Sequence, residues 1–450
     1  MERIRHWLRN VVGLDRAIIF TVLARGWASL AGIVTVILIA RFLSPAEQGY
    51  YYTFGSLVAL QIVFELGFSF VILQMASHER AHLSISPDYE ISGDPIAHAR
   101  LASVFQKSVY WYAVAAILMA VTLLFGGFEF FAVHQHSSHA VDWQLPWAMV
   151  AVAASLTFQL DPVLSFLEGC GFVANVARLR FAQAITGSLL AWIALFSHHG
   201  LFAPAMMILG NAFASCLWLF GKRRLLLGLF RYRTSQHRVQ WRREVWPFQW
   251  RIAISWLSGY FIFQLFNPVL FAYRGPVEAG RMGMSLSLAN ALQAIAISWL
   301  NTKSAPFGTM IAKKNYDELD RSFFRALKQS IAVFLAGAIV ICCLTVYLTE
   351  AHIHFAQRIL TPSVLSILLL STAINVAVFG QALYLRAHKQ EKLLLNSVVG
   401  AILVAASTYF LGRMYGAAGM VIGNFVIALA FGLPSALFVF TKYRRAWHAD

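Results

Sequence analysis

Polar side chains recur at helical spacing inside long apolar stretches of this sequence. Gln61, Glu65 and Ser69 follow one another at intervals of four residues, so a helix would carry them on one face. Asp161 lies in another apolar stretch, four residues before Ser165. A buried carboxylate is either protonated or paired, and carboxylates inside membranes often belong to proton relays or ion pathways. Glu65 and Asp161 are therefore candidates to exchange a proton or bind Na⁺.

Structural ion pairing is the alternative for these carboxylates. Arg178 and Arg180 follow Glu168 across an expected helical turn, and either arginine is within reach of Glu168 and of Asp161. Carboxylates that pair with these arginines would hold the helices together without a role in transport.

Arg25 lies well inside the first apolar stretch, one turn before Ser29. A charged residue at the centre of a membrane helix costs about 2.5–3.5 kcal/mol on insertion scales. We therefore expect Arg25 to face a cavity or a partner, and its guanidinium is well suited to bind phosphate. The alternatives are a structural ion pair and a side chain that snorkels to the membrane surface.

Further amides lie in a later apolar stretch. Asn290, Gln293 and Asn301 fall close to one helical face. Together with Gln61, these amides are suited to contact polar substrate groups, with interhelical hydrogen bonding as the alternative.

The elements that must position these residues are membrane helices. Hydrophobic residues make up 59% of the 450 residues and charged residues 12%, about half the charge of an average soluble domain. A membrane helix needs about 20 mostly apolar residues. The sequence contains twelve such segments, at approximately 18–43, 49–75, 104–128, 145–168, 178–197, 200–220, 247–273, 279–303, 326–348, 357–385, 390–412 and 416–441.

The basic residues predict the orientation of these helices. With the N-terminus inside, most of the 36 Lys and Arg residues fall on the cytoplasmic side, and only Arg274, Arg281, Arg358 and Arg413 lie outside. Cytoplasmic loops of membrane proteins collect Lys and Arg. We therefore expect twelve spans with both termini in the cytoplasm. This bias also accounts for the net charge of +16, so nucleic acid is not an expected partner.

An internal repeat predicts two halves. Pro45-Ala-Glu47-Gln-Gly49 returns as Pro276-Val-Glu278-Ala-Gly280, and Ile208-Leu-Gly210-Asn211 returns as Val421-Ile-Gly423-Asn424. Two halves of six helices have the same orientation and form parallel repeats. We expect an N-terminal lobe at 1–220, a basic cytoplasmic linker at 221–246 and a C-terminal lobe at 247–450. The fold class is thus an all-α membrane protein with two parallel six-helix lobes around a central cavity.

No enzymatic motif is found. The sequence has no phosphate-binding Gly-Lys-Ser loop, no nucleophile elbow, no HExxH motif and no zinc-site cysteine spacing. The expected outer loops are too short for a catalytic domain. We therefore predict no catalytic residues, no metal site and no cofactor. The linker is interpreted as an orientation signal, with anionic lipid headgroups as a second interpretation.

The stretch from Ala40 to Tyr51, with Arg41, Pro45, Glu47 and Gly49, resembles the helix 1–2 signature of bacterial polysaccharide transporters. These are the Wzx-like O-antigen and exopolysaccharide flippases of the multidrug/oligosaccharidyl-lipid/polysaccharide exporter superfamily. The stretches from Gly275 to Gly280 and from Leu385 to His388 resemble further turns of that family. Gln48 departs from its pattern, because an aromatic residue often precedes the signature glycine.

The resemblance implies a flippase for a polyprenyl-pyrophosphate-linked oligosaccharide in a bacterial inner membrane, working by alternating access. It implies as partners the lipid-linked oligosaccharide, membrane lipids, and polysaccharide polymerase or other assembly proteins. Moving the polar head through hydrocarbon unaided is prohibitive. Arg25 is the expected pyrophosphate ligand, Arg41 and Arg274 are expected near the outer mouth, and Arg251 near the inner one. The complete candidate set for substrate binding is Arg25, Gln61, Asn290, Gln293, Asn301, Arg251 and Arg274, with Glu65 and Asp161 as residues that couple transport to H⁺ or Na⁺.

Three other functions compete with this hypothesis. A multidrug exporter of the same superfamily would prefer an acidic, aromatic cavity, which Glu65 and Asp161 favour and Arg25 opposes. Relatives that flip lipid II commonly have fourteen helices. A membrane glycosyltransferase, ligase or polymerase would need a long outer loop with catalytic residues, and the sequence has none.

Overall fold

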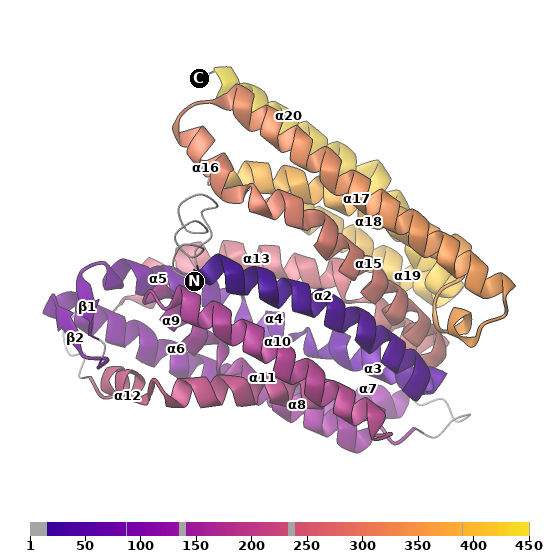
Figure 1. Cartoon of the computed structure of the whole chain (residues 1–450), viewed down its shortest axis with the longest axis horizontal. Helices are drawn as coiled ribbons and strands as arrows, with labels where there is room; N and C mark the ends of the chain where they lie inside the picture. Colours follow the sequence, from indigo (N-terminus) through magenta and orange to yellow (C-terminus); the bar gives the residue numbers. More distant parts are fainter. Residues whose placement is uncertain (1–15, 87, 135–140, 233–238, 389, 450) are drawn as a thin grey trace, which may run out of the picture. The chain divides into compact units, whose positions relative to one another are not determined.

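The computed structural model describes residues 16–86, 88–134, 141–232, 239–388 and 390–449. The chain divides into two compact units. Unit 1 holds the described residues up to Phe42, then Leu57–Val133 and Asp142–Trp256. Unit 2 holds Leu43–Ser56, His134, Val141 and the described residues from Leu257 onward. Figure 1 labels the helices and strands along the chain.

Unit 1 is a bundle of long helices with one small hairpin. Its elements are α2 (Arg16–Phe42), α4 (Gln61–Glu65), α5 (Phe68–Arg80), β1 (Leu83–Ile85), β2 (Ile91–Gly93), α6 (Pro95–Val121), a π-helical turn (Thr122–Gly126), α7 (Gly127–Val133), α8 (Gln144–Phe158), α9 (Asp161–Gly169), α10 (Val173–Phe196), a 3₁₀ turn (Gly200–Phe202), α11 (Ala203–Phe220), α12 (Arg223–Arg231), a π-helical turn (Trp241–Val245) and most of α13 (Trp246–Phe263). Helix α10 packs against both α2 and α11, and α5 packs against α6 and α9.

Unit 2 contains the remaining helices. They are α3 (Pro45–Val58), which joins it through its first part, α14 (Phe266–Arg274), α15 (Pro276–Thr302), α16 (Ser304–Ala312), α17 (Tyr316–Glu350), a 3₁₀ turn (His354–Arg358), α18 (Pro362–Ala387), α19 (Leu394–Ile427), a π-helical turn (Ala428–Gly432) and α20 (Leu433–Ala449). Helix α15 packs against α14, α17 and α18.

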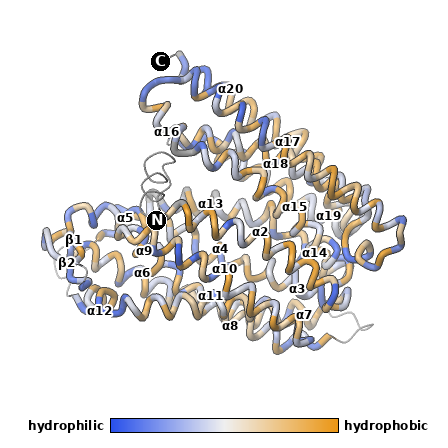
Figure 2. Tube along the Cα trace, in the orientation of Figure 1, coloured by the Kyte–Doolittle hydropathy of each residue, from blue (hydrophilic) through white to orange (hydrophobic). Residues whose placement is uncertain are grey.

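The helices have the composition of membrane spans. Within the described residues, nine helices are long and apolar enough to cross a membrane, or up to eleven if each of two bent pairs is one span. Large apolar side chains such as Leu217 and Phe438 are 67% and 69% exposed, as expected for surfaces that face lipid. Figure 2 shows this apolar character along the long helices. The chain is therefore a multi-pass membrane protein.

The predicted number of twelve spans is not confirmed by length and composition. One apolar stretch, Leu394–His448, counts as a single helix on these grounds. Its backbone leaves the helical region at Gly416, where φ is 65°. A Cβ added at Gly423 or Gly419 would meet Ser407 or Leu411, so the chain turns back and two antiparallel arms lie side by side. The predicted segments at 390–412 and 416–441 correspond to these arms.

Both copies of the Pro-x-Glu-x-Gly repeat start a helix, α3 and α15, but their glutamates act differently. In α3 the Ser44 amide donates to Glu47 Oε2 at 2.7 Å and the Glu47 amide donates to Ser44 Oγ at 3.2 Å, which is a capping box. Glu278 cannot do this, because glycine precedes Pro276. It instead accepts a hydrogen bond from the amide of Ala417 at 2.6 Å, and so caps the second arm that begins after Gly416.

A short hairpin of two strands lies between α5 and α6. Strands β1 and β2 pair antiparallel, with Ser84 opposite Ser92. The alternation of Ile and Ser residues on both sides of a turn satisfies a strand period of two, although the strands are very short.

Candidate functional site

Glu65 and Asp161 come together in unit 1. Each lies next to a break in a helix. Leu66 and Gly67, which follow Glu65, have φ of 51° and 67°, and α4 and α5 are bent by 45° at this point. Asp161 begins α9 directly after Leu160, where α8 has ended. Broken helices of this kind form the binding sites of many transporters, because the interrupted backbone leaves polar groups free to bind ions.

The two carboxylates share their surroundings with a tyrosine. Asp161 and Glu65 are near enough for their charges to interact, and both act on Tyr112 of α6. The Tyr112 hydroxyl lies 2.9 Å from Ser69 Oγ, and Tyr112 is fully buried. We call Glu65, Asp161, Tyr112 and Ser69 the acidic group. Neighbouring carboxylates disfavour simultaneous ionisation, so one proton or monovalent cation bound near this group would relieve their repulsion.

The arginine predicted to pair with these carboxylates is mainly a partner of Glu168. Arg180 Nη2 lies 2.8 Å from Glu168 Oε2. Asp161 forms no ion pair within 4.0 Å among the described residues. Glu168 is therefore the carboxylate that forms the predicted structural ion pair, and Asp161 remains a member of the acidic group.

Tyr112 could not be identified from the sequence. It lies in an apolar helix beside other aromatic residues, and a tyrosine in such a stretch reads as part of the apolar packing. Only its distance to Ser69 across two helices assigns it to the acidic group.

Arg25 is exposed on α2. Its guanidinium makes no ion pair or hydrogen bond with another described residue. Trp27, two residues later, faces α10 and donates from Nε1 to Ala184 O at 3.1 Å and to Ser188 Oγ at 3.0 Å. Since each residue turns the helix by about 100°, Arg25 points away from α10. Arg25 thus forms no structural ion pair with any described residue.

The predicted amides lie on the two units separately. Gln61 is half-buried at the start of α4 in unit 1. Asn290 is exposed, and Gln293 and Asn301 are half-buried, all on α15 in unit 2. Among the described residues none of these side chains has a hydrogen-bond partner, so their amide groups are free to bind water or substrate.

Two further arginines were predicted to bind substrate, and the structure describes the side chain of only one of them. Arg274 ends α14 and donates from Nη2 to the carbonyl of Met414, so it caps the end of the first arm of α19. The side chain of Arg251 lies outside the described part of the structure.

Gln48 has a clear structural role that its departure from the family pattern did not suggest. It is 1% exposed, and its Nε2 donates to Gly280 O and to Arg358 O, both at 2.9 Å. Arg358 Nη2 in turn donates to Leu43 O at 2.6 Å. Burial lowers the pKa of Arg358, while the charge of Glu47 raises it. These contacts tie α3, α15 and the His354–Arg358 turn together within unit 2.

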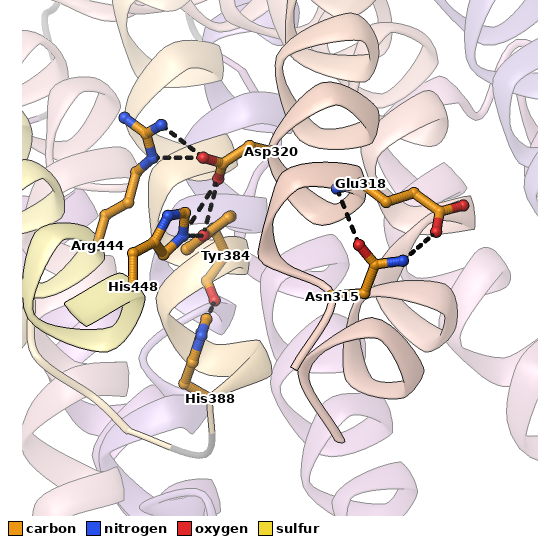
Figure 3. Close-up of polar contacts among 7 residues, drawn as sticks. All are labelled: Asn315, Glu318, Asp320, Tyr384, His388, Arg444 and His448. Carbon is orange, nitrogen blue, oxygen red and sulfur yellow. Dashed lines mark hydrogen bonds and ion pairs between the residues drawn. The ribbon is translucent and has the colours of Figure 1, made fainter. Parts of the chain in front are cut away.

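A second polar cluster in unit 2 lies around Asp320 of α17 and is drawn in Figure 3. Arg444 of α20 donates to Asp320 Oδ2 from Nε at 2.8 Å and from Nη2 at 2.5 Å. The Tyr384 hydroxyl donates to Asp320 Oδ1 at 3.0 Å, and His448 Nε2 lies 3.7 Å from the same oxygen. His388 stacks on Trp447 at 3.7 Å. The cluster fastens the last helix to α17 and α18.

We expect Asp320→Asn to loosen α20. The substitution removes the negative charge that Arg444 faces. A hydrogen bond to a charged group contributes about 1.5–3 kcal/mol to stability. The loss should be smaller here because the Arg444 side chain is 34% exposed, so solvent screens the interaction. Hydrogen exchange of Leu433–Ala449 should become faster. Asp317→Asn, on the exposed first turn of the same helix, is the matched control. Equal exchange in α20 for both variants would contradict the role assigned to Asp320.

No group of three or more His, Cys, Asp or Glu side chains that could hold a metal ion occurs among the described residues. The acidic group contains two carboxylates, so any cation there would need oxygen ligands from the backbone or from water as well.

Solved structures share this fold over nearly the whole chain. An inward-facing multidrug resistance MATE family transporter of the MOP superfamily has a TM-score of 0.65 at 14% identity, covering 96% of this chain and 99% of that one. The MATE multidrug transporter DinF-BH has a TM-score of 0.62 at 15% identity and 96% coverage of each chain. The lipid II flippase MurJ, in an inward closed conformation, has a TM-score of 0.59 at 13% identity, covering 96% of this chain and 90% of that one.

No family model and no curated protein matches the sequence. At identities this low the structural similarity shows the fold alone. The predicted all-α membrane fold is confirmed as that of MOP superfamily transporters. The similar structures are transporters and not enzymes, and they include both drug exporters and a lipid flippase.

Proposed function

We propose that this protein is a flippase that moves a polyprenyl-pyrophosphate-linked oligosaccharide across a bacterial inner membrane by alternating access. Both termini would lie in the cytoplasm, and the polymerase and other assembly proteins would use the translocated product. The substrate combines an anionic pyrophosphate, a polar sugar chain and a long lipid tail. A protein that flips it must shield the polar head from hydrocarbon, because burial of unpaired polar groups is costly.

One observation carries the proposal: the exposed guanidinium of Arg25 on a membrane helix. A cation at this depth is stable where it faces water or an anion. Arginine binds phosphate oxygens in a bidentate manner. An anionic lipid headgroup satisfies both conditions during translocation, whereas a cationic drug would be repelled.

The amides of α15 support the same substrate class. Asn290, Gln293 and Asn301 present both donors and acceptors, and sugar hydroxyls need both. Their lack of partners among the described residues distinguishes them from amides that join helices. In this proposal they bind the oligosaccharide while Arg25 binds the pyrophosphate.

The acidic group would couple transport to an ion gradient. Two carboxylates that interact at short range resist simultaneous ionisation, so uptake of one H⁺ or Na⁺ between them changes the charge of unit 1 by one. Release on the other side of the membrane would give the cycle its direction. No separate cofactor is needed for such a cycle.

We expect Glu65→Gln and Asp161→Asn to uncouple transport from the ion gradient. In proteoliposomes, a wild-type rate that responds to an imposed H⁺ or Na⁺ gradient should lose most of that response in either variant, because one carboxylate alone can no longer share the cation. Glu168→Gln, which removes the partner of Arg180, is the matched control and should keep the response. A full gradient response in both variants would remove these residues from the coupling step.

The sidedness of the lipid-linked oligosaccharide in membranes of a deletion strain tests the function itself. Accumulation on the cytoplasmic side, with loss of surface polysaccharide, should be reversed by the wild-type gene. Normal surface polysaccharide in the deletion strain would overturn the proposal.

A cation-coupled multidrug exporter of the MATE type is the second candidate. The acidic group favours it, since Glu65, Asp161 and Tyr112 offer the negative charge and the aromatic ring that a cationic drug prefers. New sensitivity of the deletion strain to cationic drugs, with normal surface polysaccharide, would establish this function.

A further inference from the structure

The short helix α12, which follows α11, has two different faces. Leu225 and Leu229 are 2% and 1% exposed on the side toward the bundle, where α12 packs on α6. Leu227 and Phe230 are 48% and 55% exposed. The exposed face is completed by three arginines, Arg223, Arg224 and Arg231. We call these five exposed residues the outer face of α12.

The helix is held firmly enough for this outer face to be preformed. Gln106 of α6 donates from Nε2 to the carbonyls of Leu229 and Tyr232 at 2.9 and 2.8 Å, so it caps the C-terminus of α12. At the other end, Lys222 is buried, donates to the hydroxyl of Tyr89, and lies 5.0 Å from the centroid of the Phe172 ring.

The outer face begins where a membrane span ends. The span Gly200–Phe220 is separated from α12 by only a two-residue turn. Phe220 is 65% exposed, and Arg223 stacks on its ring at 4.4 Å and donates to its carbonyl at 3.2 Å. The helix therefore starts at the depth of the lipid headgroups.

Within the described part of the chain, the arginines of the outer face have no anionic partner. No described carboxylate forms an ion pair with Arg223, Arg224 or Arg231. Apolar side chains interleaved with Arg or Lys are typical of helices that lie in the membrane interface. The predicted orientation places this end of α11 on the cytoplasmic side, where leaflets rich in anionic lipid attract such segments.

We propose that the outer face of α12 is a binding surface for anionic phospholipid headgroups of the cytoplasmic leaflet. Leu227 and Phe230 insert among the upper acyl chains, and the three guanidinium groups bind headgroup phosphates. This inference does not depend on the transported substrate.

The preference of the full-length protein for anionic lipid tests this inference. The protein is reconstituted in mixed phosphatidylcholine and phosphatidylglycerol membranes, and the association of each spin-labelled lipid is measured by electron spin resonance. The triple variant Arg223→Gln, Arg224→Gln, Arg231→Gln should lower the preference for phosphatidylglycerol by at least about fivefold, which is the effect expected from a single basic residue near the membrane surface.

Two further variants distinguish an effect of the outer face of α12 from an effect of the net charge of the protein. The matched control Arg321→Gln, Arg325→Gln, Lys328→Gln removes the same charge from the exposed side of α17 and should keep most of the preference. The triple lysine variant of the α12 arginines keeps the charge and should retain the preference. An unchanged preference in the glutamine variant of α12, or an equal loss in the α17 control, would overturn the proposal.

The wild-type protein provides a test that needs no variant. Raising the salt concentration should weaken its preference for phosphatidylglycerol, because screening acts on exposed charges. A preference that does not respond to salt would contradict a surface made of exposed arginines.

Discussion

Arg25→Ala should slow translocation of the lipid-linked oligosaccharide by about 10- to 100-fold, with normal amounts of protein in the membrane. The magnitude follows from the loss of hydrogen bonds to a charged group, which contribute about 1.5–3 kcal/mol. Folding should not suffer, because the Arg25 side chain is exposed and its guanidinium makes no hydrogen bond or ion pair with the described residues. The measurement is the outward movement of lipid-linked oligosaccharide in proteoliposomes.

Two matched variants make this result specific. Arg25→Lys keeps the charge but not the bidentate geometry, so we expect a rate between those of the wild type and the alanine variant. Arg178→Ala removes an exposed arginine from α10, the helix that packs on α2, and should transport normally. A wild-type rate for Arg25→Ala at normal protein level would exclude Arg25 from the mechanism.

Gly49→Ala should strongly reduce the amount of folded protein. Gly49 of α3 lies against the backbone of α15, and a Cβ at this position would overlap the carbonyl of Pro276. The reciprocal glycine is also crowded, though less so, since a Cβ on Gly280 would lie 2.9 Å from the amide nitrogen of Gly49. Overpacking of this kind costs about 1–3 kcal/mol or more, and here the obstacle is backbone, which cannot rotate away.

Gly55→Ala is the control for this prediction. Gly55 lies on the same helix, and nothing is found within 4 Å of an added Cβ. Alanine there should leave stability unchanged or raise it, because alanine favours a helix over glycine by up to about 1 kcal/mol. The yield of monodisperse protein and its thermal unfolding midpoint measure both variants. Equal behaviour of Gly49→Ala and Gly55→Ala would show that the crossing of α3 and α15 is not tightly packed.

This crossing also gives the repeated motif a physical meaning. The sequence showed two copies of Pro-x-Glu-x-Gly, and the structure brings Gly49 and Gly280 into contact within unit 2. The second repeat behaves similarly, since Gly210 packs against Thr186 and Gly187 of α10 while Gly423 packs against Ser407 and Leu411 of the arm before it. Small residues recur because they let helix backbones approach closely.

Some of the candidate site followed from local patterns. The grouping of Gln61, Glu65 and Ser69 and the isolation of Arg25 depend only on helical spacing within apolar stretches. The pairing of Arg180 with Glu168 depends on one short turn between α9 and α10. The sequence did not reveal the roles of Tyr112, Gln48 and the cluster around Asp320, because the hydrogen-bond partners of these residues lie on other helices.

The amino-acid sequence by itself determined that the chain forms apolar helices, but not always where they begin and end: α6 and α17 begin at Pro95 and Tyr316, ahead of the predicted segments at 104–128 and 326–348. A membrane helix satisfies its backbone hydrogen bonds internally, so the length and composition of a segment decide whether it spans. Only the tertiary structure decided which faces of these helices meet. It also showed the helix breaks at Leu66 and Leu160, next to Glu65 and Asp161. The reason is that contacts between distant segments depend on how small side chains pack, and the local spacing of residues in a sequence carries no information about that packing.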